Sequence, residues 1–147
     1  MERQIGTAEK LIRNHFVGVL ATCSKRGPYT TLVAFAPFKS IETIVFATLR
    51  NTRKYDNMKK NVKVSLLVDS RRNVPEDFKD ASALTILGTV RESTGKERKK
   101  LAGALLLRHP HLEELVNDPD CAVMALAVQR FVLASRFQEV VEMEIKR

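Results

Sequence analysis

Residues 17–48 read VGVLATCSKRGPYTTLVAFAPFKSIETIVFAT, and this stretch decides the fold. It holds three apolar runs rich in β-branched and aromatic residues, at 17–23, 29–38 and 43–48. The breaks between them are short and carry turn residues, at 25–28 and 39–40. Because connections this short cannot hold a crossover helix, the three runs predict an antiparallel meander of strands.

Helical and strand patterns alternate along the rest of the chain. Apolar residues at helical spacing predict a helix over 2–16, and the polar segment 51–61 predicts a short one. A longer helical stretch is interrupted at Pro110, which gives helices over 96–108 and 111–116. Further strands are expected at 62–68, 81–90, 121–134 and 137–145. Gly88 marks an expected bulge, and residues 69–80 are expected to form a charged loop.

These elements predict one mainly β domain over residues 1–147, an antiparallel barrel of about six to seven strands with flanking helices. Several of the strands are apolar on both faces: 17–23, 31–36, 62–68 and 122–128. A barrel interior covers only one face of each strand. Helices or a second subunit must cover the other face, so we expect a homodimer.

Composition narrows the class of protein. The chain has 147 residues, of which 44% are apolar and 29% charged, as is typical of a single globular domain. No stretch approaches the roughly 18 uninterrupted apolar residues of a membrane span, and residues 1–5 hold no apolar signal core. The two cysteines, Cys23 and Cys121, form no CxxC pair, which favours a reducing compartment. We therefore expect a cytoplasmic protein with no membrane partner, in which Cys23 is a small buried hydrophobe.

Positive charge is in excess and is unevenly spread. The chain carries 25 Lys and Arg against 17 Asp and Glu, a net charge of +8. Between positions 50 and 63 stands a single acid, Asp56, among six cations: Arg50, Arg53, Lys54, Lys59, Lys60 and Lys63. An anionic partner near this segment is expected from the local excess of cations.

The residues around the start of the expected helix 51–61 suit a phosphate group. Thr48 ends the preceding strand, Thr52 stands at the N-cap position, and Arg53 and Lys54 follow directly. A helix start presents unpaired N–H groups, so two hydroxyls and two cations there can bind phosphate without a glycine-rich loop. The same residues can also be a helix cap and a solvated charged face, and spacing alone favours neither interpretation.

Other motifs are absent or weak. The sequence holds no nucleotide-binding glycine loop, no HExxH and no GxSxG. His109 and His111 flank Pro110, but no cluster of cysteines or carboxylates completes a metal site beside them. We expect no metal site, and a solvated helix junction at these histidines.

In combination, several segments resemble the FMN-binding split-barrel proteins related to pyridoxamine 5′-phosphate oxidase. In the family's order and spacing they are GPYTTLVAF at 27–35, IVFAT at 44–48, TRK at 52–54, NVKVSLLV at 61–68 and LGTVRE at 87–92. The resemblance covers most of the chain. It implies an antiparallel split β-barrel that forms a homodimer, with FMN bound at the subunit interface.

The resemblance also implies which residues hold the cofactor. Thr52, Arg53 and Lys54 match the Ser/Thr-Arg-Lys that grips the FMN phosphate in the family. Thr48 matches a threonine at the end of the preceding strand that also contacts the cofactor. No side chain needs to act as an acid or base in hydride chemistry at a flavin, so no catalytic residue is expected.

The second strand both matches the family and departs from it. Thr31 stands where the oxidase has a phosphate-binding arginine, and Leu32 and Val33 would lie along the flavin ring and offer it backbone groups. The oxidase's substrate-binding lysine falls at Ala36, and its C-terminal arginine motif has no counterpart in residues 137–147. The resemblance therefore implies an FMN-dependent oxidoreductase acting on an unknown small molecule, and not the oxidase itself.

Three alternatives stay open. A deazaflavin coenzyme has a phosphate and an acidic tail that suit the same basic stretch. Haem is a second alternative, because LRHPH at 107–111 resembles haem-degrading members of the split-barrel proteins. The third is a non-enzymatic barrel that binds nucleic acid, but the nine Phe and Tyr residues stand mostly inside apolar runs, where they are not available for base stacking.

Overall fold

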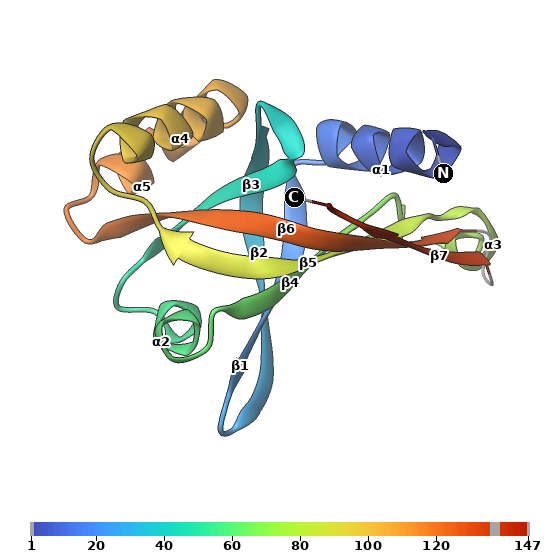
Figure 1. Ribbon diagram of the computed structural model, residues 1–147, viewed down its shortest axis with the longest axis horizontal. Coiled ribbons are helices and arrows are strands. Elements are labelled where there is room, and N and C mark those ends of the chain that lie inside the picture. Colours follow the sequence, from blue (N-terminus) through green and yellow to red (C-terminus); the bar gives the residue numbers. More distant parts are fainter. Residues whose placement is uncertain (1, 136–138, 147) are drawn as a thin grey trace.

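Strands and helices alternate along the chain largely as the patterns predict (Figure 1). The computed structural model describes residues 2–135 and 139–146. The strands are β1 Val17–Ser24, β2 Gly27–Phe38, β3 Ser40–Leu49, β4 Lys63–Asp69, β5 Ala83–Glu92, β6 Cys121–Ser135 and β7 Glu139–Glu144. The helices are α1 Glu2–Asn14, α2 Arg53–Lys60, α3 Asp77–Asp80, α4 Gly95–Arg108, the 3₁₀ turn η1 Pro110–Leu112 and α5 Glu113–Asn117.

Within the described residues, six strands close into a barrel. They are neighbours in the order β3-β2-β1-β4-β5-β6, and β3 also pairs with β6, so that the sheet closes on itself. Each pairing is antiparallel, which confirms the meander that the short connections predicted. The extra strand β7 pairs with β6 outside the closed ring. The fold is an α+β antiparallel split barrel.

The barrel interior forms the main core. Phe35, Phe46 and Phe131 are fully buried in it, one each from β2, β3 and β6. Helix α1 adds Ala8 and Ile12, which are one helical turn apart and so lie on the same face. Burial of side chains of this size contributes about 1.5–3 kcal/mol each to folding.

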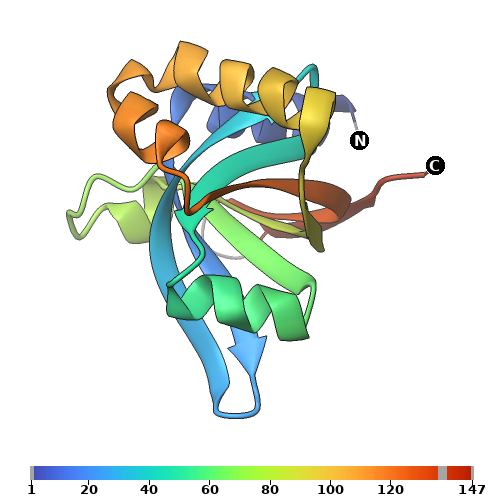
Figure 2. The ribbon, with the colours of Figure 1, turned by 90° about the vertical axis from the view of Figure 1, so that its left-hand side faces the viewer.

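A second, smaller core covers part of the outer barrel surface. Leu101 and Leu105 of α4 and Val116 of α5 pack on outward-facing residues of β2, β3 and β6, namely Ala36, Val45, Val123 and Ala125. The apolar outer face predicted for 122–128 is thus covered here by helices, and that of 31–36 is covered only at its end, at Ala36. Figure 2 shows α4 and α5 over one end of the barrel, while the β1–β2 hairpin projects at the other end beside α2.

The outer face of β1, β2 and β4 stays open to solvent. Val19 of β1 is paired with Leu32 of β2 and with Leu67 of β4, so the three side chains share one face of the sheet. Leu32 is 68% exposed and the neighbouring Val17 is 53% exposed. None of the described helices covers this surface as α4 covers the other.

The predicted bulge at Gly88 is confirmed. The register between β5 and β6 shifts between Leu87 and Gly88. A Cβ at Gly88 would lie 2.1 Å from the carbonyl oxygen of Ala127, far inside contact distance. Glycine is required here because the two backbones approach so closely.

Two local predictions were wrong. Residues 69–80 contain the short helix α3, whose Asp77 carboxylate accepts backbone N–H groups of the preceding turn, among them that of Asn73 at 2.7 Å. Cys23 is exposed, not buried, because Thr22 takes the inward-facing position and adjacent residues of a strand point to opposite faces.

The chain ends differ little from the prediction. The described part of the last strand is Glu139–Glu144, and the predicted start at Phe137 lies outside the described residues. Met143 is buried while Glu142 and Glu144 are exposed, as the alternating pattern predicted. None of the helices in the described part of the chain is long and apolar enough to cross a membrane.

Candidate functional site

Two hydroxyl groups join the end of β3 to the start of α2. The Oγ1 atoms of Thr48 and Thr52 lie 2.9 Å apart. The Thr52 hydroxyl donates to the carbonyl of Leu49 at 2.8 Å and accepts the N–H of Tyr55 at 3.3 Å, so Thr52 is the N-cap, as predicted. The hydroxyl protons of both threonines are engaged inside this turn. The pair therefore fixes where α2 begins and leaves its first two N–H groups outside the helical ladder.

Two of the cations around α2 are paired with carboxylates. Arg50 donates to Glu92 at 2.6 Å, and Lys60 to Asp56 at 3.1 Å. The Glu92 carboxylate also accepts the Tyr55 hydroxyl at 2.6 Å, which ties α2 to the end of β5. The Arg50 hydrogen bond is the main cause that holds the pKa of Glu92 below its usual range. Sequence reasoning missed this network, because its members are 37 and 42 positions apart.

Arg53 and Lys54 have no carboxylate partner among the residues that the structure describes. The Arg53 guanidinium lies over the ring of Tyr29, 4.5 Å from its centroid. Lys54 is half-buried, and desolvation lowers the pKa of its ammonium group. It lies on the same face of α2 as Asn57 and Met58, the face turned toward the barrel. A partly desolvated cation without a partner at a helix start is a suitable phosphate ligand.

Thr31 carries a buried hydroxyl oxygen that has no hydrogen-bond partner. It belongs to the inward-facing row of β2 that also holds Tyr29 and Val33. A buried polar atom left unpaired costs about 1–3 kcal/mol, so a ligand that bonds to it would remove this penalty. The sequence prediction named Thr31, and its environment fits a cofactor contact.

Leu32 and Val33 point to opposite faces of β2, as adjacent strand residues must. Val33 is 5% exposed and belongs to the core, whereas Leu32 is on the outer face. Their side chains therefore do not lie side by side along one flat ligand. Only backbone groups and one of the two side chains are available to it.

One edge of β2 is open next to these residues. Strand β1 pairs with β2 from Gly27 to Ala34, but β3 pairs with it only from Phe35 onward. Among the described strands, none pairs with the other edge over residues 27–34. The backbone donors and acceptors of that edge are thus available to a ligand that lies along the strand.

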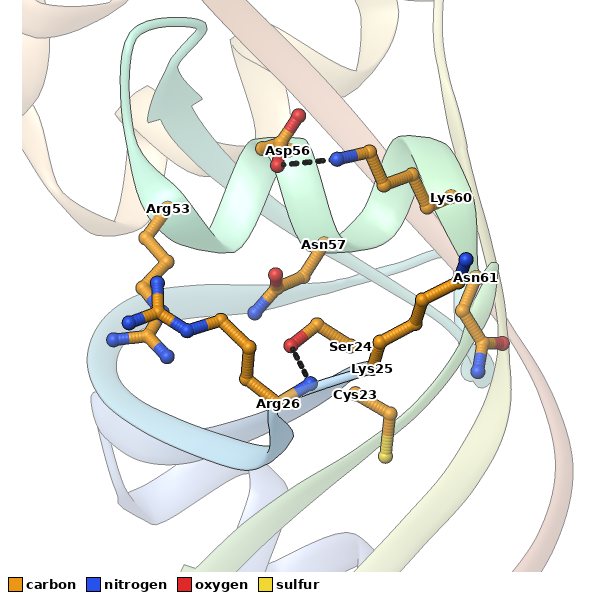
Figure 3. Close-up of a pocket in the computed structure, with 9 residues that line it drawn as sticks. All are labelled: Cys23, Ser24, Lys25, Arg26, Arg53, Asp56, Asn57, Lys60 and Asn61. Carbon is orange, nitrogen blue, oxygen red and sulfur yellow. Dashed lines mark hydrogen bonds and ion pairs between the residues drawn. The ribbon is translucent and has the colours of Figure 1, made fainter.

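A groove lies beside this region, between the β1–β2 turn and α2 (Figure 3). Its volume is about 860 Å³, within the range of about 300–1,000 Å³ that small-molecule sites occupy. Arg53 is the one residue of the predicted site that lines it. The sequence held no signal for the groove, because its walls come from segments about 30 residues apart.

Comparison with known proteins identifies the fold family. The family model for pyridoxamine 5′-phosphate oxidase matches residues 6–134, most of the chain. The chain belongs to the pyridoxamine 5′-phosphate oxidase family. Ala36, which stands where the oxidase was expected to have a substrate-binding lysine, is buried under α4 and cannot reach the inner face of β2.

Individual relatives are more distant. A pyridoxamine 5′-phosphate oxidase homolog of Schizosaccharomyces pombe is 38% identical over an alignment of 77 positions, and the match covers 46% of this chain and 40% of that protein. A heme binding protein from Mycobacterium smegmatis has a TM-score of 0.85 at 17% identity, over 95% of this chain and 57% of that one. A FAD-binding protein from Mesorhizobium loti has a TM-score of 0.68 at 16% identity, over 86% of this chain and 89% of that one. The chain thus spans about half the length of the first two.

The two histidines of residues 107–111 are not both available as ligands to a haem or a metal. His109 is 2% exposed, not solvated as predicted, and its Nε2 lies 2.8 Å from the carbonyl oxygen of Phe35. Burial is the main cause that lowers the pKa of His109. Within the described residues, no group of three or more potential metal ligands is gathered.

Proposed function

We propose that the protein binds FMN, with the phosphate at the start of α2. The observation that carries this proposal is Lys54, a half-buried cation without a carboxylate partner at a helix N-terminus. Arg53 supplies a second positive charge, and the first N–H groups of the helix supply donors. The unpaired hydroxyl of Thr31 offers one more contact on the facing strand. Thr48 and Thr52 position this set, because they fix the helix start.

The ring system of the flavin would lie along the open edge of β2. The free backbone groups of residues 27–34 are suited to the hydrogen-bonding edge of the isoalloxazine. Val33 faces the core and Leu32 the outer surface, so the two cover opposite sides of the strand. The strand thereby fixes the orientation of the ring and excludes water from one side of it.

We propose that the activity is that of an oxidoreductase acting on a small molecule. A bound flavin supplies hydride transfer, so the protein needs to bind, orient and partly desolvate it. We assign no side chain an acid or base role in this transfer. The oxidase's own reaction is not proposed, since Ala36 replaces the substrate lysine and is buried.

A homodimer with the cofactor at the subunit interface is part of the proposal. The outer face of β1, β2 and β4 presents apolar residues that no described helix covers, among them Val17 and Leu32. Exposed apolar patches of this kind mark interaction sites in soluble proteins. The patch is continuous with the open edge of β2, so a second copy seated there would complete the flavin site. Such a pairing would be isologous, as is usual in dimers.

The cellular compartment is proposed from the cysteines. Cys23 is exposed and Cys121 is buried, and neither is in a disulfide. An exposed free thiol is compatible with the reducing cytoplasm and is oxidised elsewhere. We propose a cytoplasmic location on this ground.

The first test is an absorption spectrum of the purified protein, before and after addition of FMN, with any released ligand identified by mass. Flavin bands and a released mass equal to FMN are expected. A Soret band would indicate that the bound ligand is haem instead of FMN. Deazaflavin absorbance would indicate that it is the deazaflavin coenzyme. A colourless protein that binds none of the three would contradict the proposal.

A further inference from the structure

A second groove lies at the end of the barrel opposite α2. It opens where the end of α1, the turn between β2 and β3, and the last turn of α4 meet. Figure 1 shows that turn between the two helices. The volume of the groove is about 490 Å³, within the range of about 300–1,000 Å³ that small-molecule sites occupy. We name it the apolar groove. Its lining shares no residue with the proposed FMN site.

Apolar side chains make most of the wall of the apolar groove. Leu107 of α4 is 89% exposed, and Phe16, which precedes β1, is 55% exposed. Pro37 and Phe38 from the end of β2 and Ala104 from α4 also line it. Apolar surface that stays in contact with water is unfavourable, and an apolar ligand would cover it. This part of the groove therefore suits a hydrocarbon chain.

The charged residues that line the apolar groove in the described part of the chain are all cations: Arg13, Lys39 and Arg108. Arg13 is paired with Glu9 at 3.1 Å, one turn back on α1. Lys39 and Arg108 have no carboxylate partner among the residues that the structure describes. The groove thus has uncompensated positive charge beside its apolar wall. Charge complementarity favours an anion over a neutral or positively charged ligand.

Arg108 is held in place by the end of α1. Its Nη2 group donates to the carbonyls of Ile12 at 2.8 Å and Arg13 at 3.1 Å, and also to that of His15. Its guanidinium carbon lies 4.7 Å from the ring centroid of Phe16. The Nε and Nη1 groups make no hydrogen bond to the described residues and are not fully buried. Because the guanidinium is already fixed, these groups are preorganised donors for an anion.

The environment of Arg108 favours a single negative charge. Burial desolvates the guanidinium and is the main cause that lowers the pKa of Arg108. A partly desolvated cation without a counter-ion is unfavourable, and one carboxylate would compensate it. Arg13 needs no further anion, because Glu9 already neutralises it. A doubly charged phosphate would lose more hydration beside the apolar wall than a carboxylate does.

Lys39 brings an ammonium group to the same groove. It stands between β2 and β3 with a φ of 66°, in the left-handed region that favours glycine. Its Nζ atom lies 5.4 Å from the centroid of the Phe38 ring, so the ammonium group is next to the apolar wall. The long, flexible stem of a lysine lets this group move to a bound carboxylate while the backbone stays in place.

We propose that the apolar groove binds a small apolar carboxylate, such as a medium-chain fatty acid. The carboxylate would accept hydrogen bonds from Arg108 and Lys39. The hydrocarbon would cover the exposed surfaces of Phe16, Phe38 and Leu107. The proposal does not rest on flavin binding, because the two sites share no residue.

The test is isothermal titration calorimetry of the full chain with octanoate and with 1-octanol, both at concentrations at which they stay dissolved as monomers. Octanol has the same hydrocarbon chain without the charge, so the comparison isolates the contribution of the cations. We expect octanoate to bind about tenfold or more tighter than octanol, as one charge-assisted contact predicts. Equal affinities, or no binding of octanoate, would overturn the proposal.

Two variants with matched controls locate the binding. Lys39→Gln removes a groove cation, and Lys63→Gln removes an equal charge from an exposed position at the start of β4. Leu107→Asp places a carboxylate in the wall, and Val140→Asp makes the same kind of change at an exposed position on β7. Because Leu107 and Val140 are exposed, both Asp variants should keep the melting temperature of the wild type.

Lys39→Gln is expected to weaken octanoate binding about two- to fivefold, the value of an exposed ion pair, and to leave octanol binding unchanged. Leu107→Asp is expected to weaken octanoate binding about tenfold or more, because it removes apolar contact and repels the ligand. The two controls should match the wild type. Octanoate affinity that is unchanged in Lys39→Gln or Leu107→Asp, or that falls equally in the controls, would overturn the proposal.

The rival occupant of the apolar groove is a second copy of the chain. Sedimentation of the wild type and Leu107→Asp tests it. A dimer that dissociates in Leu107→Asp, together with no octanoate binding by the wild type, would make the groove a subunit interface and overturn the proposal. None of these readings uses FMN, so failure of the flavin proposal leaves them valid.

Discussion

The hydroxyl oxygens of Thr48 and Thr52 lie 2.9 Å apart, the first at the end of β3 and the second at the N-cap of α2. This contact makes the position of α2 depend on the barrel itself. Lys54 follows two residues later, so the place of its ammonium group is set by a strand that is buried in the core. The site is thus built on rigid elements, which is what precise ligand binding requires.

Thr52→Ala is expected to destabilise the protein by about 1 kcal/mol, because the helix loses its N-cap. Thr52→Ser keeps a hydroxyl and should lose much less. Chemical denaturation of both variants measures the difference in the free energy of unfolding. Equal loss in the two would show that the methyl group, and not the cap, is what matters.

Thr31→Val separates binding from folding. The hydroxyl is buried and unpaired, so an isosteric apolar side chain is expected to leave the free energy of unfolding unchanged or to raise it by about 1–3 kcal/mol. FMN affinity is expected to fall about 2- to 12-fold, the value of one neutral hydrogen bond. Thermal unfolding without ligand and an FMN titration provide the two readings. A loss of stability with unchanged affinity would assign Thr31 a structural role only.

The affinity for FMN is expected to fall at alkaline pH. Desolvation lowers the pKa of Lys54 below its ordinary value of 10.5, and a bound phosphate would raise it again. Binding therefore takes up a proton once the pH exceeds the lowered pKa of the free protein, and affinity declines as the pH rises through it. Lys54→Arg stays charged and should not show this decline. A titration series from neutral to alkaline pH distinguishes the two proteins, and identical profiles would remove Lys54 as the titrating group.

Glu92→Gln is expected to destabilise the protein by about 1–2 kcal/mol, discounted for the partial exposure of the pair with Arg50. The pKa of Glu92 is lowered in the folded state, so its contribution is complete above the usual pKa of 4.5 and is lost as the pH falls through the lowered value. Unfolding of wild type and variant at neutral and acid pH tests this. The difference in stability between them should shrink in acid, and a constant difference would refute the linkage.

Much of the fold was predictable because it rests on local chemistry. The short turns around β2 allowed only antiparallel neighbours, Gly88 marked a close backbone approach, and Thr52 marked a helix start. Helix α3 was missed because it depends on a carboxylate that caps its own preceding turn, in a segment whose composition is typical of a loop. Cys23 was misplaced because one step along a strand reverses the face.

The site was predictable only in part. Thr31, Thr48, Thr52, Arg53 and Lys54 were named from spacing and resemblance. The sequence does not show that the Thr31 hydroxyl is unpaired or that Glu92 neutralises Arg50. Both features depend on which residues far away along the chain lie nearby in the fold. The groove between the β1–β2 turn and α2 likewise forms only when these two segments meet in the folded chain.

The most direct test of the account is the dissociation constant of FMN for the wild type, Lys54→Ala and Lys63→Ala. Lys63 is an exposed cation at the start of β4 and serves as the matched control. We predict that Lys54→Ala weakens binding by about 10- to 150-fold, as loss of a charge-assisted contact requires, and that Lys63→Ala changes it by less than about twofold. Wild-type affinity in Lys54→Ala, or no FMN binding by any of the three proteins, would contradict the account.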